Sequence, residues 1–409
     1  MNPNSAPPNE KDKKGLRNVV SLGLVSFFTD FSTEMILGIL PLYITNNLGA
    51  SKAVLGVIDG SADLINYIFR MIAGSLSDKF RKRKIFILIG YGLSTISKPF
   101  FAVTTGWLDA FIVRATDRIG KGVRTSPRDA LIADSVPESI SGKAFGIHRT
   151  IDQLGAIVGP IAAFAILQSM DIHWVFLFSL IPGIVAVVVL IFFVKEIVLP
   201  KKKEITTTFF SNVKNLVKEN KPYVFFIIIS GIFGLGAFNF SFLLLKASDM
   251  GIEESMIPIV YALINISHTL IGIPAGILAD KIGKEIILIA GYFIFVVSIF
   301  LMIFLSGNQL YAYVFAFVFG LYVGIIETVQ RAIIPKFVPS ESRGTGFGLY
   351  YLVIGISFFI CNVIFGYLWD NYGFNVAASY SLSFSVMSII SMVIFLKSYA
   401  SSRYKFQRN

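Results

Sequence analysis

Thiol and imidazole side chains are scarce in this chain, which has one cysteine, Cys361, and three histidines in 409 residues. One cysteine cannot form an intrachain disulfide, and a metal site built from thiolates is excluded. The histidines are scattered, no His-x-x-x-His or Ser/His/Asp pattern is present, and no glycine-rich loop resembles a nucleotide-binding cradle. We therefore expect no metal, no cofactor and no enzymatic activity. A receptor is disfavoured because neither tail is long enough for a signalling domain.

Long hydrophilic segments are also scarce, and residues 196–220 form the main one inside the chain. Hydrophobic side chains make up 55% of the residues and charged ones 15%, which is more apolar surface than a soluble core uses. Stretches of about 20 apolar residues are long enough to cross a bilayer. The sequence therefore predicts an all-α membrane protein with twelve transmembrane helices, at 18–46, 52–76, 85–104, 108–135, 142–168, 173–195, 221–247, 255–278, 285–306, 309–335, 345–368 and 374–397.

Two halves of the chain resemble each other at a constant offset of 202 residues. The segment AGSLSDK at 73–79 recurs as AGILADK at 275–281, and the same offset pairs Val136-Pro137 with Val338-Pro339. Many secondary transporters build a substrate site between two such repeats. We expect two six-helix bundles at 18–195 and 221–397, joined by a cytoplasmic linker at 196–220, with cytoplasmic tails at 1–17 and 398–409.

The formal net charge of +11 is distributed by topology and does not predict binding to nucleic acid. Lysine and arginine concentrate in the N-terminal tail, the loop after residue 78 and the linker, while the opposite loops carry almost none beyond Lys52 and Lys246. This bias places both termini in the cytoplasm, in a multi-pass protein of the cytoplasmic (inner) membrane. Residues 1–17 lack the apolar core of a signal peptide, so we expect a disordered tail and no removable signal.

The copied segments extend into two loops with a shared pattern. The first reads Gly74-x-Leu76-x-Asp78-Lys79-x-Arg81-Lys82-Arg83-Lys84, and the second reads Gly276-x-Leu278-Ala279-Asp280-Lys281-x-Gly283-Lys284. They resemble the loops between helices 2 and 3 and between helices 8 and 9 of the major facilitator superfamily, with Arg81 where the family commonly has glycine. The resemblance implies the fold of that superfamily, and a role as cytoplasmic anchor and gate, not as substrate ligands, for Gly74, Asp78, Lys79, Arg83, Gly276, Asp280 and Lys281.

Two further patterns resemble the same superfamily. The fourth predicted helix (108–135) carries Arg114-x-x-Asp117, which resembles a motif of the superfamily whose arginine is linked to proton transfer. The sequence departs from that motif at two positions, because Asp117 replaces the usual glutamine and Arg118 occupies a usual glycine position. The fifth predicted helix (142–168) carries Gly146, Gly155, Gly159 and Pro160, with a spacing that resembles the motif associated with antiporters of the superfamily, mostly drug or metabolite exporters. That likeness favours export, and plain packing of small residues is the alternative.

Charges inside the predicted helices are the informative residues, because each costs roughly 2.5–3.5 kcal/mol at mid-bilayer depth on insertion scales. Asp30 and Glu34 lie one turn apart on the first predicted helix (18–46). Two carboxyl groups this close do not readily ionise together, so one of them tends to keep a proton, which is what a proton-carrying site needs. Basic side chains form a stripe along the fourth predicted helix (108–135), beside Asp117. The candidate substrate and proton-coupling residues of the first half are Asp30, Glu34, Asp59, Asp63, Arg114, Asp117, Arg118, Lys121, His148, Arg149 and Asp152.

The second half has fewer such groups, and we select Asn239, Glu327 and Arg331. Glu327 and Arg331 are one turn apart, so we expect them to pair with each other. His268 is expected to be a structural histidine. Three glycines, at 231, 234 and 236, precede Asn239 and would let helix 7 bend.

Taken together, the residues and the resemblance predict a secondary active transporter that moves a small organic solute by alternating access, with the proton as coupling ion and export by antiport. The alternative is proton symport or facilitated uptake of an organic anion, drawn by the basic helix 4. The fold needs no second copy, so we expect a monomer in the lipid bilayer.

Overall fold

The computed structural model describes residues 10–197, 209–305, 307–338 and 343–406, and over these residues it contains helices and connecting turns with no strand. The prediction of an all-helical chain is confirmed for this part of the sequence. Two compact units are present and are described separately. Unit 1 comprises the described residues within 1–37 and 68–202, and unit 2 those within 38–67 and 203–409. The first part of helix α3 (Lys52–Phe80) thus belongs to unit 2, and the predicted boundaries at 195 and 221 stay a prediction.

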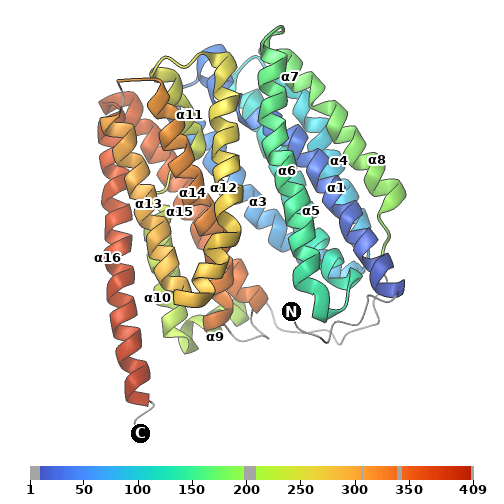
Figure 1. Cartoon of the computed structure of the whole chain (residues 1–409), viewed down its shortest axis with the longest axis vertical. Coiled ribbons are helices and arrows are strands. Elements are labelled where there is room, and N and C mark those ends of the chain that lie inside the picture. Colours follow the sequence, from blue (N-terminus) through green and yellow to red (C-terminus); the bar gives the residue numbers. More distant parts are fainter. Residues whose placement is uncertain (1–9, 198–208, 306, 339–342, 407–409) are drawn as a thin grey trace. The chain divides into compact units, whose positions relative to one another are not determined.

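Unit 1 is built from six long helical stretches, two of which are divided (Figure 1). Helix α1 packs mainly against α6 and α8, and α4 packs against α5. Its elements are α1 (Glu10–Leu37), the second part of α3, α4 (Arg83–Ser97) continued by the 3-10 segment η2 (Lys98–Val103), α5 (Trp107–Ser135), η3 (Glu138–Ile140), α6 (Ser141–Leu167), α7 (Ile172–Phe178) and α8 (Leu180–Phe193).

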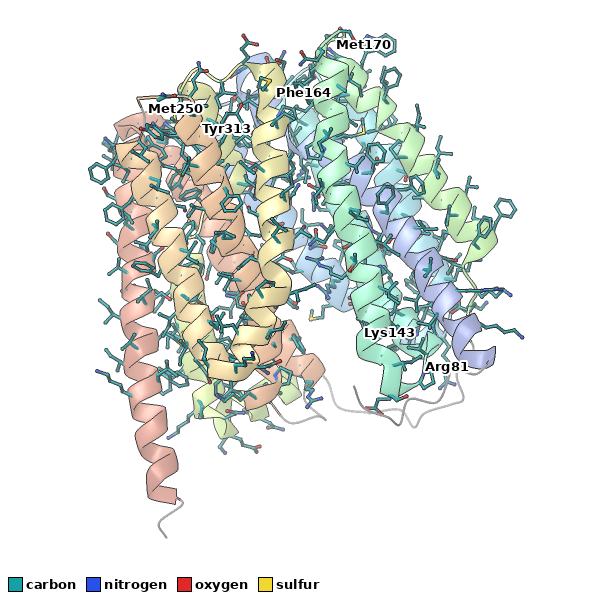
Figure 2. The ribbon with its side chains drawn as sticks, in the orientation of Figure 1. Arg81, Lys143, Phe164, Met170, Met250 and Tyr313 are labelled. Carbon is teal, nitrogen blue, oxygen red and sulfur yellow. The ribbon has the colours of Figure 1, made fainter. Side chains whose placement is uncertain are left out.

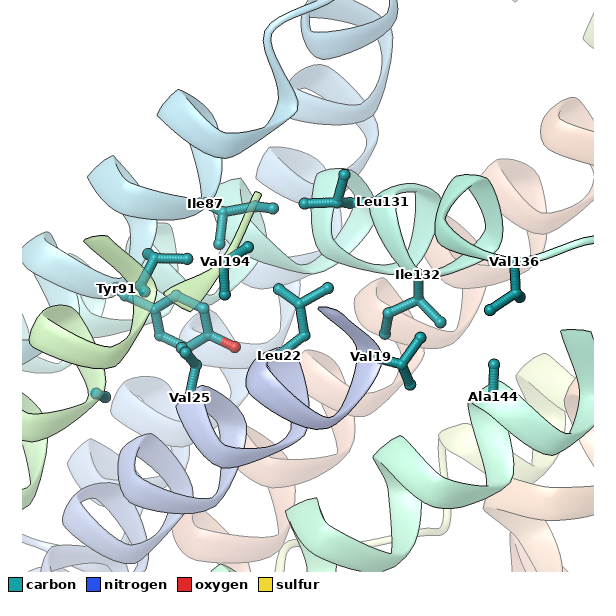
Figure 3. Close-up of a cluster of buried hydrophobic side chains, with 12 residues drawn as sticks. Val19, Leu22, Val25, Ile87, Tyr91, Leu131, Ile132, Val136, Ala144 and Val194 are labelled. Atoms are coloured by element: carbon teal, nitrogen blue, oxygen red, sulfur yellow. The ribbon is translucent and has the colours of Figure 1, made fainter. Parts of the chain in front are cut away.

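A buried apolar cluster joins five helices of unit 1 (Figure 3). Because lipid tails are as apolar as these side chains, their packing stabilises the unit through van der Waals contacts and not through exclusion of water. The cluster fixes the end of the unit that holds the residue 81 loop, and its members are Val19, Leu22, Val25, Ile87, Tyr91, Leu131, Ile132, Val136, Ala144, Ala186, Leu190 and Val194.

Small residues bring the backbones of unit 1 together. A Cβ atom added to Gly159 of α6 would lie 2.7 Å from the carbonyl oxygen of Phe31 in α1, and one added to Gly155 would meet the carbonyl of Phe27. On the other side of the unit, a Cβ at Gly120 of α5 would lie 2.7 Å from the carbonyl oxygen of Gly90 in α4. Only glycine permits these approaches, so α6 is held directly against α1.

Unit 2 contains the remaining helices (Figure 1). Within it, α12 packs against α14, α13 against α14 and α16, and α15 against α16. Its elements are α2 (Leu40–Leu42), the π-helical turn η1 (Tyr43–Asn47), the first part of α3, α9 (Phe209–Glu219), α10 (Lys221–Gly234), α11 (Phe240–Asp249), η4 (Glu254–Met256), α12 (Ile257–Ile282), α13 (Lys284–Phe304), α14 (Leu310–Phe337), α15 (Arg343–Tyr372) and α16 (Phe374–Phe406).

The bend expected in the seventh predicted helix (221–247) is a full interruption, because α10 ends at Gly234 and α11 begins at Phe240. The freed backbone groups find side-chain partners. The amide of Asn239 donates to Oδ1 of the fully buried Asn362 at 2.8 Å, and the Ser381 hydroxyl donates to the carbonyl of Gly236. Broken helices are tolerated in a membrane where neighbouring side chains satisfy the backbone in this way.

Aromatic rings fill the interior of unit 2. Phe233 of α10 stacks on Tyr292 of α13 with ring centroids 3.8 Å apart, and Phe238 contacts Phe365 of α15 at 4.4 Å. Phe295 extends the cluster to Tyr322 of α14 at 4.6 Å. The part of the interior that these rings line is therefore apolar and aromatic.

The repeat seen in the sequence is visible in the packing of both units. In unit 1, a Cβ at Gly74 of α3 would lie 3.1 Å from Cβ of Ser126 in α5. In unit 2, a Cβ at Gly276 of α12 would lie 3.6 Å from Cγ2 of Thr328 in α14. Each residue of the second pair follows its counterpart by the same 202 positions, so the two contacts are copies of one another.

Nine helical stretches of the described residues are long and apolar enough to cross a membrane. The other predicted spans correspond to α3 and α5, and to the interrupted pair α10 and α11. Large apolar side chains also cover the outside of both units; Phe192 of α8 and Ile273 of α12, for example, are 75% and 73% exposed. Such surfaces are stable in lipid, so the chain is a multi-pass membrane protein.

Candidate functional site

Helix α5 carries a basic stripe through the interior of unit 1. Arg114, Arg118 and Arg124 are each 5% exposed or less. Asp117 lies among them, and its carboxylate accepts a hydrogen bond from the Ser94 hydroxyl at 2.6 Å and contacts Arg118 Nε at 3.4 Å. The Arg124 guanidinium lies over the ring of Tyr91, 4.6 Å from the centroid.

A lysine that the sequence reasoning missed joins this stripe. Lys98, at the start of η2, is 2% exposed, and its ammonium donates to Thr33 Oγ1 of α1 at 3.2 Å. It interacts electrostatically with Asp117, Arg124, Asp30 and Arg118. Its position in an apolar segment predicted to span the membrane is the signal that would have identified it.

The carboxyl groups of Asp30 and Asp152 meet across the contact between α1 and α6. The two carboxyl groups lie close enough to share a hydrogen bond when one of them is protonated, and Asp152 Oδ2 accepts from Arg149 Nη1 at 3.3 Å. Asp30 also interacts electrostatically with Glu34 of α1 and with Lys121 and Arg124 of α5. The structure therefore brings predicted residues of three helices into one charged site.

A second polar cluster lies one turn away along the same two helices. The hydroxyl of Ser26 in α1 accepts from Arg128 Nη1 at 3.1 Å, and lies 3.0 Å from His148 Nε2 and 2.9 Å from the Tyr91 hydroxyl. His148 and Asp152 are four residues apart on α6. A row of groups able to exchange protons thus follows the seam between α1 and α6.

The residues of the loop motif lie at one end of unit 1. Figure 2 shows Arg81 and Lys143 at this end, opposite Met170. Arg83 of α4 pairs with Asp134 of α5 at 2.8 Å and with Asp78 at 3.4 Å, while Glu196 caps the start of α4 by accepting from the amide of Lys84 at 2.7 Å. These contacts tie the ends of α3, α4, α5 and α8 together, away from the Asp30 site. Lys79, Asp280 and Lys281 are exposed.

The glycines of the antiporter-like pattern, which lie on α6, divide into two groups. Gly155 and Gly159, with the buried Pro160 beside them, lie against α1 as described above, whereas Gly146 has no atom within 4 Å of an added Cβ. Packing of α6 on α1 therefore accounts for two of the three glycines.

The candidate residues of unit 2 are more dispersed. Asn239 caps α11 by accepting from the Ser241 amide at 3.0 Å. Glu327 of α14 lies 3.7 Å from Nε2 of His268 in α12, and the Arg331 side chain, its predicted partner, lies outside the described residues. Asp59 is 3% exposed, on the part of α3 that belongs to this unit, with Asp63 one turn further along. Among the described residues, no cluster of three or more His, Cys, Asp or Glu side chains could hold a metal ion.

Sequence comparison places the chain in a known family. The family model described as Major Facilitator Superfamily matches residues 22–267 and 224–406. An uncharacterised MFS-type transporter of Methanocaldococcus jannaschii is 37% identical over 400 residues, covering 95% of this chain and 96% of that protein. The multi-drug resistance efflux pump PmrA of Streptococcus pneumoniae is 25% identical over 344 residues, covering 81% of this chain and 84% of the pump.

Solved structures with the same fold include transporters. The nucleoside transporter NupG superposes with a TM-score of 0.71 at 16% identity, over 93% of this chain and 99% of that one. The POT family transporter PepTSo gives a TM-score of 0.78 at 14% identity, over 95% and 98% of the two chains. At this identity the likeness shows the fold alone. With the family match over most of its length, the chain belongs to the Major Facilitator Superfamily and is a membrane transporter, not an enzyme.

Proposed function

We propose that this protein is a proton-coupled secondary transporter that exports a small organic solute by antiport. The observation that carries the proposal is the buried charged site of unit 1, where Asp30, Asp152 and the basic stripe of α5 meet. Burying several charges together costs free energy that apolar side chains would not. A transporter gains from this arrangement because its titratable groups then respond to one another.

Support for export comes from a relative and not from the geometry. The efflux pump PmrA aligns over 81% of this chain, and the helix 5 pattern that resembles antiporters is present, although two of its glycines also serve packing. In this proposal, protons entering through the protein drive the solute outward.

Uptake of an organic anion is the second candidate, and one observation favours it. Lys98 adds a fifth cation to Arg114, Arg118, Lys121 and Arg124 of α5. A carboxylate or phosphate on the solute would find several buried cations there. Proton symport, or facilitated uptake, would then accompany its entry.

The proposed topology follows the predicted segments. We propose twelve spanning stretches, counting α3, α5 and the pair α10 and α11 with the nine long apolar ones, in a monomer of the cytoplasmic membrane with both termini in the cytoplasm. Reporter domains fused after residue 197 and after residue 409 should both be active only as cytoplasmic reporters. An active extracytoplasmic reporter at either point would contradict this topology.

The test begins with thermal unfolding of the purified full-length protein in lipid nanodiscs, with matched panels of organic anions and lipophilic cations. Benzoate, benzamide and benzylamine form one matched set, and tetraphenylphosphonium and ethidium extend the cationic side. Each compound is tested at mildly acidic and mildly basic pH, because a ligand that competes with protons stabilises more at high pH. A compound that binds the basic stripe should lose its effect in Arg114→Met, and Lys143→Met, at an exposed lysine of α6, is the matched control for loss of a charge.

A stabilising compound is then placed on one side of proteoliposomes that contain a pH-sensitive dye. Proton movement opposite to the compound supports antiport. Proton movement with the compound supports the symport alternative, and transport of the compound without proton movement contradicts proton coupling.

A further inference from the structure

We propose that Asp30 of α1 and Asp152 of α6 together bind one proton, held between their carboxyl groups. The assignment of this proton as the coupling ion rests on the proposed function, whereas the site itself does not. Spacing along one helix pairs Asp30 with Glu34. The packing of unit 1 instead selects a partner on another helix.

The close approach of α1 and α6 creates the pair. Gly155 and Gly159 sit against the carbonyl groups of Phe27 and Phe31, and a Cβ at Gly23 would lie 2.9 Å from Cδ1 of Ile151. With the backbones in contact, the short side chains of Asp30 and Asp152 come close enough to share a hydrogen bond when one of them is protonated. No substrate or conformational change is needed to assemble them.

A hydrogen bond between two carboxyl groups requires a proton on one of them, because an ionised carboxylate is only an acceptor. Asp152 Oδ2 already accepts from Arg149. Asp152 Oδ1 is buried and has no hydrogen-bond donor among the described residues. A proton shared with Asp30 would satisfy this oxygen and remove the repulsion of two adjacent negative charges.

The surrounding charges oppose that proton and make it releasable. Cations reach the pair from three elements, and Glu34 of α1 adds a negative charge that favours retention. The cations are Lys121, Arg124 and Arg128 of α5, Lys98 of η2 and Arg149 of α6, and the imidazole of His148 also faces the pair from α6. Arg149 is the most accessible of the cations, with its side chain 47% exposed. Movement of this guanidinium away from Asp152 would strengthen proton binding, and its return would promote release.

The experiment measures protonation directly, by infrared difference spectroscopy of the full-length protein in lipid during a pH titration. The carbonyl stretch of a protonated carboxylic acid should be present at neutral pH in the unmodified protein. It should be lost in Asp30→Asn and also in Asp152→Asn, because either change removes one member of the pair. Glu34→Gln is the matched variant, one turn from Asp30, and should keep the band.

Four results would overturn the proposal. The band could be absent from the unmodified protein at every pH above the pKa range of ordinary carboxyl groups, which would show that neither aspartate keeps a proton there. It could survive both Asp→Asn changes, or be lost in Glu34→Gln alone, which would place the proton on α1. It could also disappear on replacing potassium chloride with sodium chloride at constant pH, which would identify a sodium site.

Folding and coupling are separated by further measurements. Asp152→Glu keeps the carboxyl group and should keep the band, so loss of the band in Asp152→Asn with retention in Asp152→Glu supports the proposal even if the amide variant is less stable. A band that behaves as proposed, in a protein whose transport moves no protons, would leave the site intact and contradict only the proposed function.

Discussion

Helices α5 and α14 occupy the same place in the two repeats but have opposite character. Counting by the 202-residue offset, Arg114, Asp117, Arg118, Lys121 and Arg124 of α5 correspond to Ala316, Phe319, Gly320, Val323 and Ile326 of α14. The small residues that pack these helices on their neighbours are nevertheless matched, as the pairs Gly74 with Ser126 and Gly276 with Thr328 show. The repeat has preserved helix packing, whereas the charges of α5 at these positions have no counterpart in α14.

An ion pair at the helix ends is preserved in position with its charges exchanged. Arg83 pairs with Asp134 in unit 1, and Glu285 pairs with Lys336 in unit 2. Both residues of the second pair follow their counterparts by 202 positions. The two contacts thus share opposite charges at these positions, with the signs exchanged between the helices.

The largest expected effect comes from exchanging the charges of the unit 2 pair. Lys336→Asp alone would set a second carboxylate beside Glu285, which is 5% exposed. This change should lower the free energy of unfolding by about 3 kcal/mol. The value is at the low end for a broken buried pair because the Lys336 side chain is 33% exposed. Adding Glu285→Arg recreates the arrangement of unit 1 and should restore most of the loss. Thermal unfolding followed by circular dichroism measures both; a double variant no better than the single one would show that the sign matters.

Transferring a charge from α5 to α14 should have the next largest effect. Ile326→Arg places a cation where unit 2 offers aromatic and aliphatic neighbours, and should cost about 2.5 kcal/mol. The reciprocal Arg124→Ile removes a buried cation from a site with several others and loses its contact with the Tyr91 ring, worth about 1 kcal/mol. Equal losses in the two variants, measured by yield of folded protein and by thermal unfolding, would contradict the division between charged and apolar units.

The turns at residues 81 and 283 provide a smaller and sharper comparison. Arg81 has a φ of 55° and Gly283 a φ of 109°, so both copies of the loop use a backbone conformation that glycine adopts most readily. Arg81→Gly should raise the free energy of unfolding by up to about 1 kcal/mol, and Gly283→Ala should lower it by about 1–3 kcal/mol. The prediction fails if Arg81→Gly is destabilising, which would show that the arginine side chain contributes more than its backbone costs.

The smallest effect is expected at Glu327, a partly exposed carboxylate of α14 in unit 2. Its side chain is 41% exposed and lies 3.7 Å from His268, so Glu327→Gln should change stability by less than about 1 kcal/mol. It should also leave proton movement intact in the proteoliposome assay, whereas Asp30→Asn abolishes it. The reverse pattern would move proton handling from unit 1 to unit 2.

Hydropathy and the repeat predicted the helices well, because both properties are carried by individual residues in order along the chain. The interruption before Asn239 was also signalled, by three glycines. The partner of Asp30 was not predicted, since spacing arguments join residues on one helix and Asp152 lies on another that only packing brings close. Lys98 was overlooked within an apolar run, and only the fold shows that its ammonium reaches Thr33 and not solvent.

The fully buried Cys361 in α15 gives unit 2 a reactive group whose labelling rate can be measured. As the sole thiol in the chain, it can react with a maleimide only when unit 2 opens, so its labelling rate under native conditions reports the opening of that half alone. Solutes or protons that act on unit 1 should then leave this rate unchanged unless the two halves are energetically linked. A single sulfur atom thereby makes the linkage between the halves measurable without adding any probe.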